Sequence, residues 1–206
     1  MDDLSGVGAA SPTHPGFVVA IPVRDEEERL PACLRALAYQ RDRLGRPIPP
    51  RLVRVVVFAN NCTDQSASVA RVLAECWSLH IRVVEARLPP EAAHAGAARR
   101  AAMDLAEAWL VEGGDKDGVI LTTDADSQVA PNWIAANLAA FETGAEAVLG
   151  RITLDDDGKL LPDALHRRGA LEDAYESLLT ELSWLLDPLE HNPWPHTPRS
   201  PARPSE

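Results

Sequence analysis

Residues 16–40, GFVVAIPVRDEEERLPACLRALAYQ, contain one strand followed by one helix. The stretch opens with a continuous apolar run that ends at Pro22, which is the pattern of a buried strand. Apolar residues then recur at helical spacing, at Leu30, Cys33, Leu34 and Leu37. A buried strand followed directly by an amphipathic helix predicts the repeating unit of a parallel sheet.

The same plan repeats along the chain. Residues 51–76 contain a second strand and a second helix, residues 80–88 a third strand, residues 95–114 a third helix that ends at a glycine pair, and residues 118–126 a fourth strand. Strands separated by helices form parallel sheets with right-handed crossovers. We therefore predict an α/β fold, with a mostly parallel sheet and helices on both faces.

Composition restricts the class of protein. The chain has 206 residues, of which 46% are hydrophobic, and this is enough to bury one sizeable core. Its net charge of −11 argues against binding to nucleic acid. The sequence contains no apolar stretch of the roughly 18 residues that a membrane span needs. These features predict a cytoplasmic protein without a transmembrane segment.

The sequence also predicts the state of the cysteines and the bounds of the folded domain. Cys33, Cys62 and Cys76 match no zinc or disulfide spacing, and we interpret them as mostly buried thiols in a reducing compartment. We predict a flexible N-terminus over residues 1–16, one domain over 17–187 and a proline-rich disordered tail over 188–206. The last part of the domain is predicted to be helical, with a stripe that packs into a core at Leu171, Tyr175, Leu178, Leu182 and Leu185.

Polar clusters follow three of the predicted strands. They are RDEE at 24–27, NNCTD at 60–64 and DADS at 124–127. In open parallel sheets, ligands bind outside the carboxyl ends of the strands, so the three clusters together predict a binding site. Each cluster alone has a simpler interpretation. The first is typical of a solvated helix start and the second of a turn in which Asp64 is a helix N-cap.

Four segments, at residues 18–37, 55–66, 95–106 and 118–134, carry a resemblance to a known family. In this order and spacing they resemble the nucleotide-sugar-binding half of the inverting family-two glycosyltransferases, which have the GT-A fold. The resemblance covers about residues 17–153. It implies an enzyme that binds a nucleotide-diphosphate sugar and transfers the sugar to an acceptor, which the sequence does not identify.

The resemblance also implies roles for individual residues. Pro22, Arg24 and Glu26 stand where the family frames the nucleotide base and ribose, and Asn60 stands where the family has an aspartate that contacts the base. Arg99 matches an arginine near the ribose and the diphosphate. Asp124 and Asp126 match the DxD motif, in which the first aspartate meets the ribose and the second holds a divalent metal, Mn²⁺ or Mg²⁺.

Two of these positions depart from the family pattern. Arg24 replaces a tyrosine, which removes an aromatic surface. Asn60 replaces a carboxylate, and because an amide both donates and accepts hydrogen bonds, the identity of the base stays open. The metal that the DxD motif implies suits the chemistry, because it can neutralise the charge of a departing nucleotide diphosphate.

Alternative functions remain at this stage. Phosphatases of the haloacid dehalogenase type also place Asp-x-Asp after a strand, with the first aspartate as nucleophile, which would be Asp124 here. However, Gln128 occupies the place of their usual Thr or Val. A non-catalytic nucleotide-sugar-binding remnant is the other alternative. The resemblance implies an acceptor-side half with a general base, and no such motif follows Gly150, so we expect a truncated transferase whose activity is uncertain.

Overall fold

The computed structural model describes residues 16–153 together with residues 171, 174–175, 177–178 and 182. Contacts divide the chain into two units, Met1–Val148 and Leu149–Glu206. All strands and helices named below belong to the first unit. The predicted disordered tail lies outside the described residues, as does the predicted flexible N-terminus except for Gly16.

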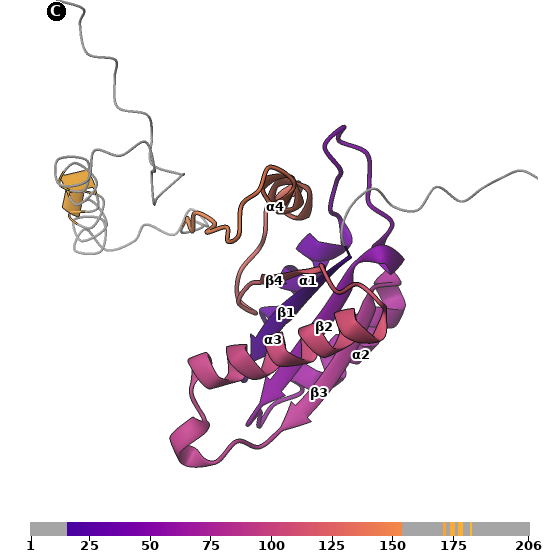
Figure 1. The fold of residues 1–206 in the computed structure, drawn as a ribbon. Helices are drawn as coiled ribbons and strands as arrows, with labels where there is room; N and C mark the ends of the chain where they lie inside the picture. The colour runs from indigo at the N-terminus through magenta and orange to yellow at the C-terminus, as the bar shows by residue number, and fades with distance from the viewer. Residues whose placement is uncertain (1–15, 154–170, 172–173, 176, 179–181, 183–206) are drawn as a thin grey trace, which may run out of the picture. The chain divides into compact units, whose positions relative to one another are not determined.

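Four parallel strands form the sheet of the first unit (Figure 1). They are β1 (Phe17–Val23), β2 (Arg54–Asn60), β3 (His80–Ala86) and β4 (Val119–Thr122). Their order is β3-β2-β1-β4, so the first strand lies between the second and the fourth. Val19 of β1 pairs with Val55 on one side and with Leu121 on the other. The predicted parallel sheet is confirmed.

Helices connect the strands as the sequence pattern indicates. They are α1 (Leu30–Ala38), α2 (Ser66–Trp77), α3 (Ala95–Glu112) and α4 (Trp133–Glu142), and two short 3₁₀ turns are η1 (Pro50–Leu52) and η2 (Pro90–Ala92). The third helix ends at the predicted glycine pair, where Gly114 takes a positive φ of 79° that a residue with a side chain adopts rarely. Among the described residues, none of the helices combines the length and apolar character needed to cross a membrane.

The two faces of the sheet are covered by different helices. Val19 and Val57 point to the face where they join a cluster with residues of α1, α2 and α4, such as Leu34. Val18 and Val56 point to the opposite face, where they pack against Ala98, Ala102 and Ala106 of α3. The strands are therefore buried on both faces, which explains their continuous apolar runs. Helices on both faces were predicted and are confirmed.

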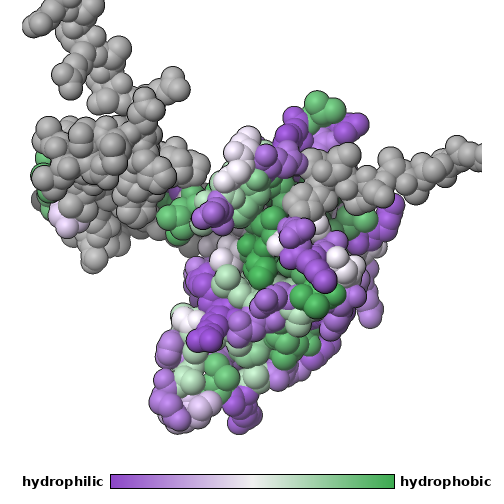
Figure 2. Space-filling model, viewed as in Figure 1, coloured by the Kyte–Doolittle hydropathy of each residue, from purple (hydrophilic) through white to green (hydrophobic). Residues whose placement is uncertain are grey.

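The surface of the first unit is mixed in character. Figure 2 shows hydrophilic residues along most of its outline in this view, with apolar patches between them. In the second unit, four residues of the predicted helical stripe are described, and they are helical but exposed: Leu171, Tyr175, Leu178 and Leu182. The predicted packing of this stripe into a core is not seen at these positions. Leu185 lies outside the described residues.

Candidate functional site

The three polar clusters lie at one edge of the sheet. All strands are parallel, so β1, β2 and β4 end on the same side, and the clusters follow directly after Val23, at Asn60 and after Thr122. This arrangement was expected from the sequence pattern. The structure shows which of the side chains at this edge contact one another.

Arg99 and Asp124 meet at the end of β4. The Arg99 Nη2 atom lies 2.5 Å from Asp124 Oδ1, and the Nη1 atom donates to Thr122 Oγ1 at 3.3 Å. The Thr122 hydroxyl donates in turn to the backbone oxygen of Ala20 at 3.0 Å. The side chains of Arg99 and Asp124 are 34% and 49% exposed, so a ligand can reach both. Two predicted site residues from segments 25 positions apart thus form one charged pair.

Thr122 did not stand out in the sequence, although its position carried a signal. Side chains alternate along a strand, so Thr122 shares the α3 face with Ile120, which packs against the cluster on that face. A polar residue at the end of a strand, on the face that a helix covers, can contact a polar residue of that helix. Thr122 contacts Arg99 in this way and supports its guanidinium.

Asp126 follows Asp124 by two residues and has an exposed carboxylate. The contact that the structure records for its side chain is a long one, 3.5 Å from Ser127 Oγ. Ala125, between the two aspartates, is buried and fixes the loop against the core. Carboxylate oxygens are the ligands that Mg²⁺ and Mn²⁺ prefer, and these ions take only one or two of them from a protein. The residues present therefore fit the expected metal.

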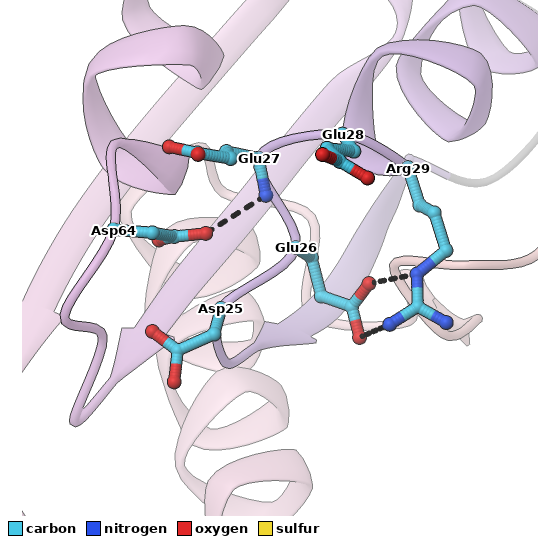
Figure 3. A pocket seen from close by; sticks show the side chains of 6 residues that line it. All are labelled: Asp25, Glu26, Glu27, Glu28, Arg29 and Asp64. Atoms are coloured by element: carbon cyan, nitrogen blue, oxygen red, sulfur yellow. Dashed lines mark hydrogen bonds and ion pairs between the residues drawn. The ribbon is translucent and has the colours of Figure 1, made fainter.

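A second feature of this edge is an acidic cavity of about 480 Å³ (Figure 3). Its lining residues are Asp25, Glu26, Glu27, Glu28, Arg29 and Asp64. Among the predicted site residues it contains Glu26 and none of the others. A cavity lined mostly by carboxylates repels a diphosphate, so we place the candidate site at Arg99 and the two DxD aspartates rather than in this cavity.

The carboxylates of the cavity join two loops. Asp25 Oδ1 accepts from the Thr63 backbone N–H at 2.6 Å, and Asp64 Oδ2 accepts from the Glu27 N–H at 2.9 Å. Glu27 Oε2 accepts from the Gln65 N–H at 2.8 Å. These bonds hold the β1–α1 loop against the β2–α2 loop, and Asp25 takes a positive φ of 54° to make its contact. Asp25 and Glu27 are exposed just before α1, as expected of a solvated helix start, and in addition they hold the second loop in place.

Asp64 has a related structural role. The N-cap position of α2 is occupied by Gln65, so the expectation that Asp64 is the N-cap is wrong by one residue. Asp64 Oδ1 nevertheless accepts from the Ser66 backbone N–H at 3.0 Å. Burial alone would raise the pKa of Asp64, but the hydrogen bonds from Ser66 and Glu27 outweigh it and hold the pKa below its ordinary value.

One group of ligand-type side chains at this edge does not suit a metal. Asp25, Cys62 and Asp64 bring ligand atoms within 4.8 Å of one another. However, burial raises the pKa of the Cys62 thiol, and a metal needs the thiolate. Both carboxylates already accept backbone N–H groups. We therefore assign this group a structural role.

The remaining predicted residues are engaged elsewhere. The Arg24 Nη1 atom donates to the Ala93 backbone oxygen at 3.0 Å, and Glu26 forms an ion pair with Arg29 at 2.7 Å. Pro22 lies within β1, paired with Phe58. Within the described residues, no hydrogen bond joins Arg24 or Glu26 to the Arg99–Asp124 pair.

Asn60 has a buried side-chain oxygen without a hydrogen-bond partner in the part of the chain that the structure describes. It is only 2% exposed, at the end of β2, and its Oδ1 atom lacks a hydrogen-bond partner among the described residues. The neighbouring Asn61 takes a positive φ of 53°, and its amide bonds both the N–H and the carbonyl of Leu88. A buried acceptor without a partner typically costs about 1–3 kcal/mol, which a donor from a ligand or water would recover.

Residues 18–179 match the sequence profile of Glycosyl transferase family 2. The chain belongs to this family. The matched range includes every strand and helix of the first unit, apart from Phe17 at the start of β1. Among curated proteins, no sequence matches this family 2 chain.

Solved structures of TarS from S. aureus are similar to this family 2 chain. TarS 1–349 in complex with UDP is 21% identical, with a TM-score of 0.47, and the match covers 69% of this chain and 39% of that one. A second structure of TarS 1–349 has a TM-score of 0.48, with the same identity and the same coverage of both chains. The family 2 chain therefore spans about two fifths of the length of TarS 1–349.

Membership of family 2 bears on the functions left open by the sequence. It does not favour the haloacid dehalogenase type of phosphatase, and in the structure the proposed nucleophile, Asp124, is paired with Arg99. It also does not favour a non-catalytic remnant. The parallel α/β sheet and the family match agree with the predicted GT-A-like class.

The cysteines of this family 2 chain are free, and they differ in environment. Cys33 is buried beneath the DxD loop, where its thiol donates to the Asp124 backbone oxygen at 3.4 Å. Burial, together with the nearby charges of Asp126 and Asp124, raises the pKa of Cys33 to about 12. Cys76 is exposed, so the expectation of buried thiols is wrong for this residue.

These environments predict a clear order of alkylation. At pH 8 the native chain is expected to react with iodoacetamide at Cys76, while Cys33 stays protonated and inaccessible. Mass spectrometry of tryptic peptides after a short reaction measures both sites, and the chain unfolded in guanidinium serves as the control in which all thiols react. Equal modification of Cys33 and Cys76 in the native chain would contradict the packing described for the DxD loop.

Proposed function

We propose that this family 2 chain binds a nucleotide-diphosphate sugar at the end of β4 and acts as a glycosyltransferase toward an acceptor that is not identified. The observation that carries the proposal is the Arg99–Asp124 pair, with the exposed carboxylate of Asp126 two residues further along the chain. An arginine and two acids at the carboxyl end of a parallel strand provide both charges that a diphosphate and its counter-ion need.

Each of these residues has a proposed role. The Arg99 guanidinium offers two N–H groups to the diphosphate oxygens, as it now offers them to Asp124 and Thr122. Asp124 accepts from a ribose hydroxyl once Arg99 has turned to the phosphates. Asp126 holds the divalent metal, Mn²⁺ or Mg²⁺. When bound, such a metal neutralises the negative charge that develops on the departing diphosphate.

The base and ribose are proposed to contact the residues at the ends of β1 and β2. Pro22, Arg24 and Glu26 border this region on the β1 side, and Asn60 borders it on the β2 side. The unsatisfied Oδ1 atom of Asn60 supports this assignment, because an N–H of a nucleobase would provide the missing donor. An amide also has N–H groups to donate, so the base is expected to present a donor and an acceptor side by side.

The general base of the reaction is not assigned. The acids that follow Gly150 all lie outside the described residues; among them are Asp155, Asp156, Asp157, Glu172, Asp173 and Glu176. For location we propose the cytoplasm, which the free state of all three cysteines supports, since disulfides persist in oxidising compartments.

A thermal-shift panel tests the proposed function. We expect a nucleotide-diphosphate sugar to raise the melting temperature in the presence of Mn²⁺. At 100 times its dissociation constant, the ligand should raise the free energy of unfolding by about 2.7 kcal/mol. The panel compares UDP-sugars and GDP-sugars, each with Mn²⁺ and with EDTA. If no nucleotide sugar stabilises the chain under either condition, the proposed function is wrong.

A further inference from the structure

Gln40 is a buried amide that makes three hydrogen bonds to backbone groups. It lies two residues after α1 and is 0% exposed. Its Nε2 atom donates to the backbone oxygens of Ala36 at 2.9 Å and Ala130 at 2.8 Å. Its Oε1 atom accepts from the Ile134 N–H at 2.9 Å. Both N–H groups and the oxygen of this amide are therefore used.

These bonds connect the end of one helix to the start of another. The Ala36 carbonyl belongs to the last turn of α1 and the Ile134 N–H to the first turn of α4, where the backbone groups of a helix lack partners within the helix. The next residue, Arg41, adds a backbone bond from its N–H to the Pro131 oxygen at 2.7 Å. The end of α1 thus holds residues 130–134 in place.

The other end of the same segment is held as well. The Thr123 N–H donates to the Ala20 oxygen at 3.4 Å, and the Cys33 thiol donates to the Asp124 oxygen at 3.4 Å. Residues 124–130 therefore span two fixed points, one at β1 and α1 and the other at Gln40. Asp126 lies on this span, and its own side chain has only the long contact with Ser127.

We infer that Gln40 is a positioning residue for Asp126, which sets where the metal-binding carboxylate stands relative to Asp124 and Arg99. This inference rests on the proposed function. Gln40 is not placed to touch donor or metal, because two of its bonds go to backbone atoms at the far end of the span and the third goes to Ala36 of α1. It acts by fixing residue 130 and the start of α4, and only a side chain with two donors and an acceptor can make this set of bonds.

Two substitutions and a matched control test the inference. Gln40→Met keeps the volume but removes all three bonds, and Gln40→Glu keeps the acceptor for Ile134 but turns a carboxylate oxygen toward the Ala130 and Ala36 carbonyls. The control is Arg54→Met. Arg54 also bridges two elements, through the Phe17 oxygen and Asp115, but it does so at the opposite end of the sheet.

The measurement is the affinity for Mn²⁺ in the presence of a nucleoside diphosphate, followed by the electron paramagnetic resonance signal of free Mn²⁺. It is made well below the melting temperature of each variant. We expect Gln40→Met to lower the affinity for Mn²⁺ about tenfold, which is typical when a residue that orients a metal ligand is lost. The affinity for the nucleoside should not change. Arg54→Met should lower the melting temperature without changing either affinity. Wild-type affinity for Mn²⁺ in folded Gln40→Met, or an equal loss in Arg54→Met, would overturn the inference.

A measurement on the unaltered chain covers the case in which the Gln40 variants do not fold. By reciprocity, Mg²⁺ with nucleoside diphosphate should stabilise the contact and slow hydrogen exchange of the Ile134 N–H. Slower exchange around Asp126 with no change at Ile134 would refute the role of Gln40 while leaving the proposed function standing. If the unaltered chain binds neither Mn²⁺ nor nucleotide, the proposed function itself fails.

Discussion

Replacing Asp126 with alanine is expected to abolish metal-dependent nucleotide binding and to leave the fold unchanged. Loss of a residue that only orients a metal ligand typically lowers the affinity for the metal about 10- to 100-fold. Loss of the proposed ligand itself should therefore lower this affinity by about 100-fold or more. The carboxylate is exposed and has one long contact, with Ser127, so the melting temperature of the free chain should change by no more than about 2 °C.

Calorimetric titration with Mn²⁺ and a nucleotide sugar measures this effect. Asp117→Ala is the matched control, because it removes the same charge from an exposed residue just before β4, at the other end of the strand. Binding by Asp126→Ala as tight as by the unaltered chain, with the same dependence on Mn²⁺, would show that the metal assignment is wrong.

The second large effect is expected from Arg99→Ala. Charge-assisted hydrogen bonds contribute about 1.5–3 kcal/mol, so nucleoside diphosphates should bind roughly 10- to 150-fold more weakly. The nucleoside should bind as before, because it carries no phosphate. The same change frees Asp124 from its ion pair, so Mn²⁺ without nucleotide should bind more tightly than to the unaltered chain.

Arg100→Ala provides the control for this prediction. The Arg100 side chain is 85% exposed, and its Nε atom is 3.9 Å from Asp104 Oδ2. The substitution therefore removes an equal charge from the next position of α3 without altering the candidate site. Equal losses of nucleoside and nucleoside diphosphate in Arg99→Ala would indicate that Arg99 is an ordinary helix residue.

The order of strands and helices was predictable because local pattern carries it. Strands buried on both faces are continuous apolar runs, and each helix shows its own spacing of buried residues. The end of α3 was predictable for a similar reason, since a glycine pair such as Gly113 and Gly114 is unfavourable inside a helix and typical of a helix end. The sequence pattern did not predict that β1 lies between β2 and β4, because the pairing of strands depends on contacts across the sheet.

The polar residues were harder to interpret for the same physical reason. Asp25 lies in a run of acids that resembles a helix start, yet its partner is Thr63, 38 residues away. Gln40 resembles the polar end of a helix, yet it bonds residues 90 and 94 positions later. The family resemblance selected Arg99 and Asp124. It did not predict that the two side chains form an ion pair with each other, which the structure shows.

The pairing of β1 with β4 has a consequence for how this chain folds. The pairs β1–β2 and β2–β3 each join strands that are consecutive in the sequence. Leu121 of β4, in contrast, pairs with Val19 of β1 across roughly a hundred residues, so a long loop must close before this pair forms. The contacts that place the DxD loop are therefore of high sequence separation and are expected to form late, after the first three strands have left the ribosome and associated. A chain halted before that step would have most of its core but not the Arg99–Asp124 pair of the proposed donor site.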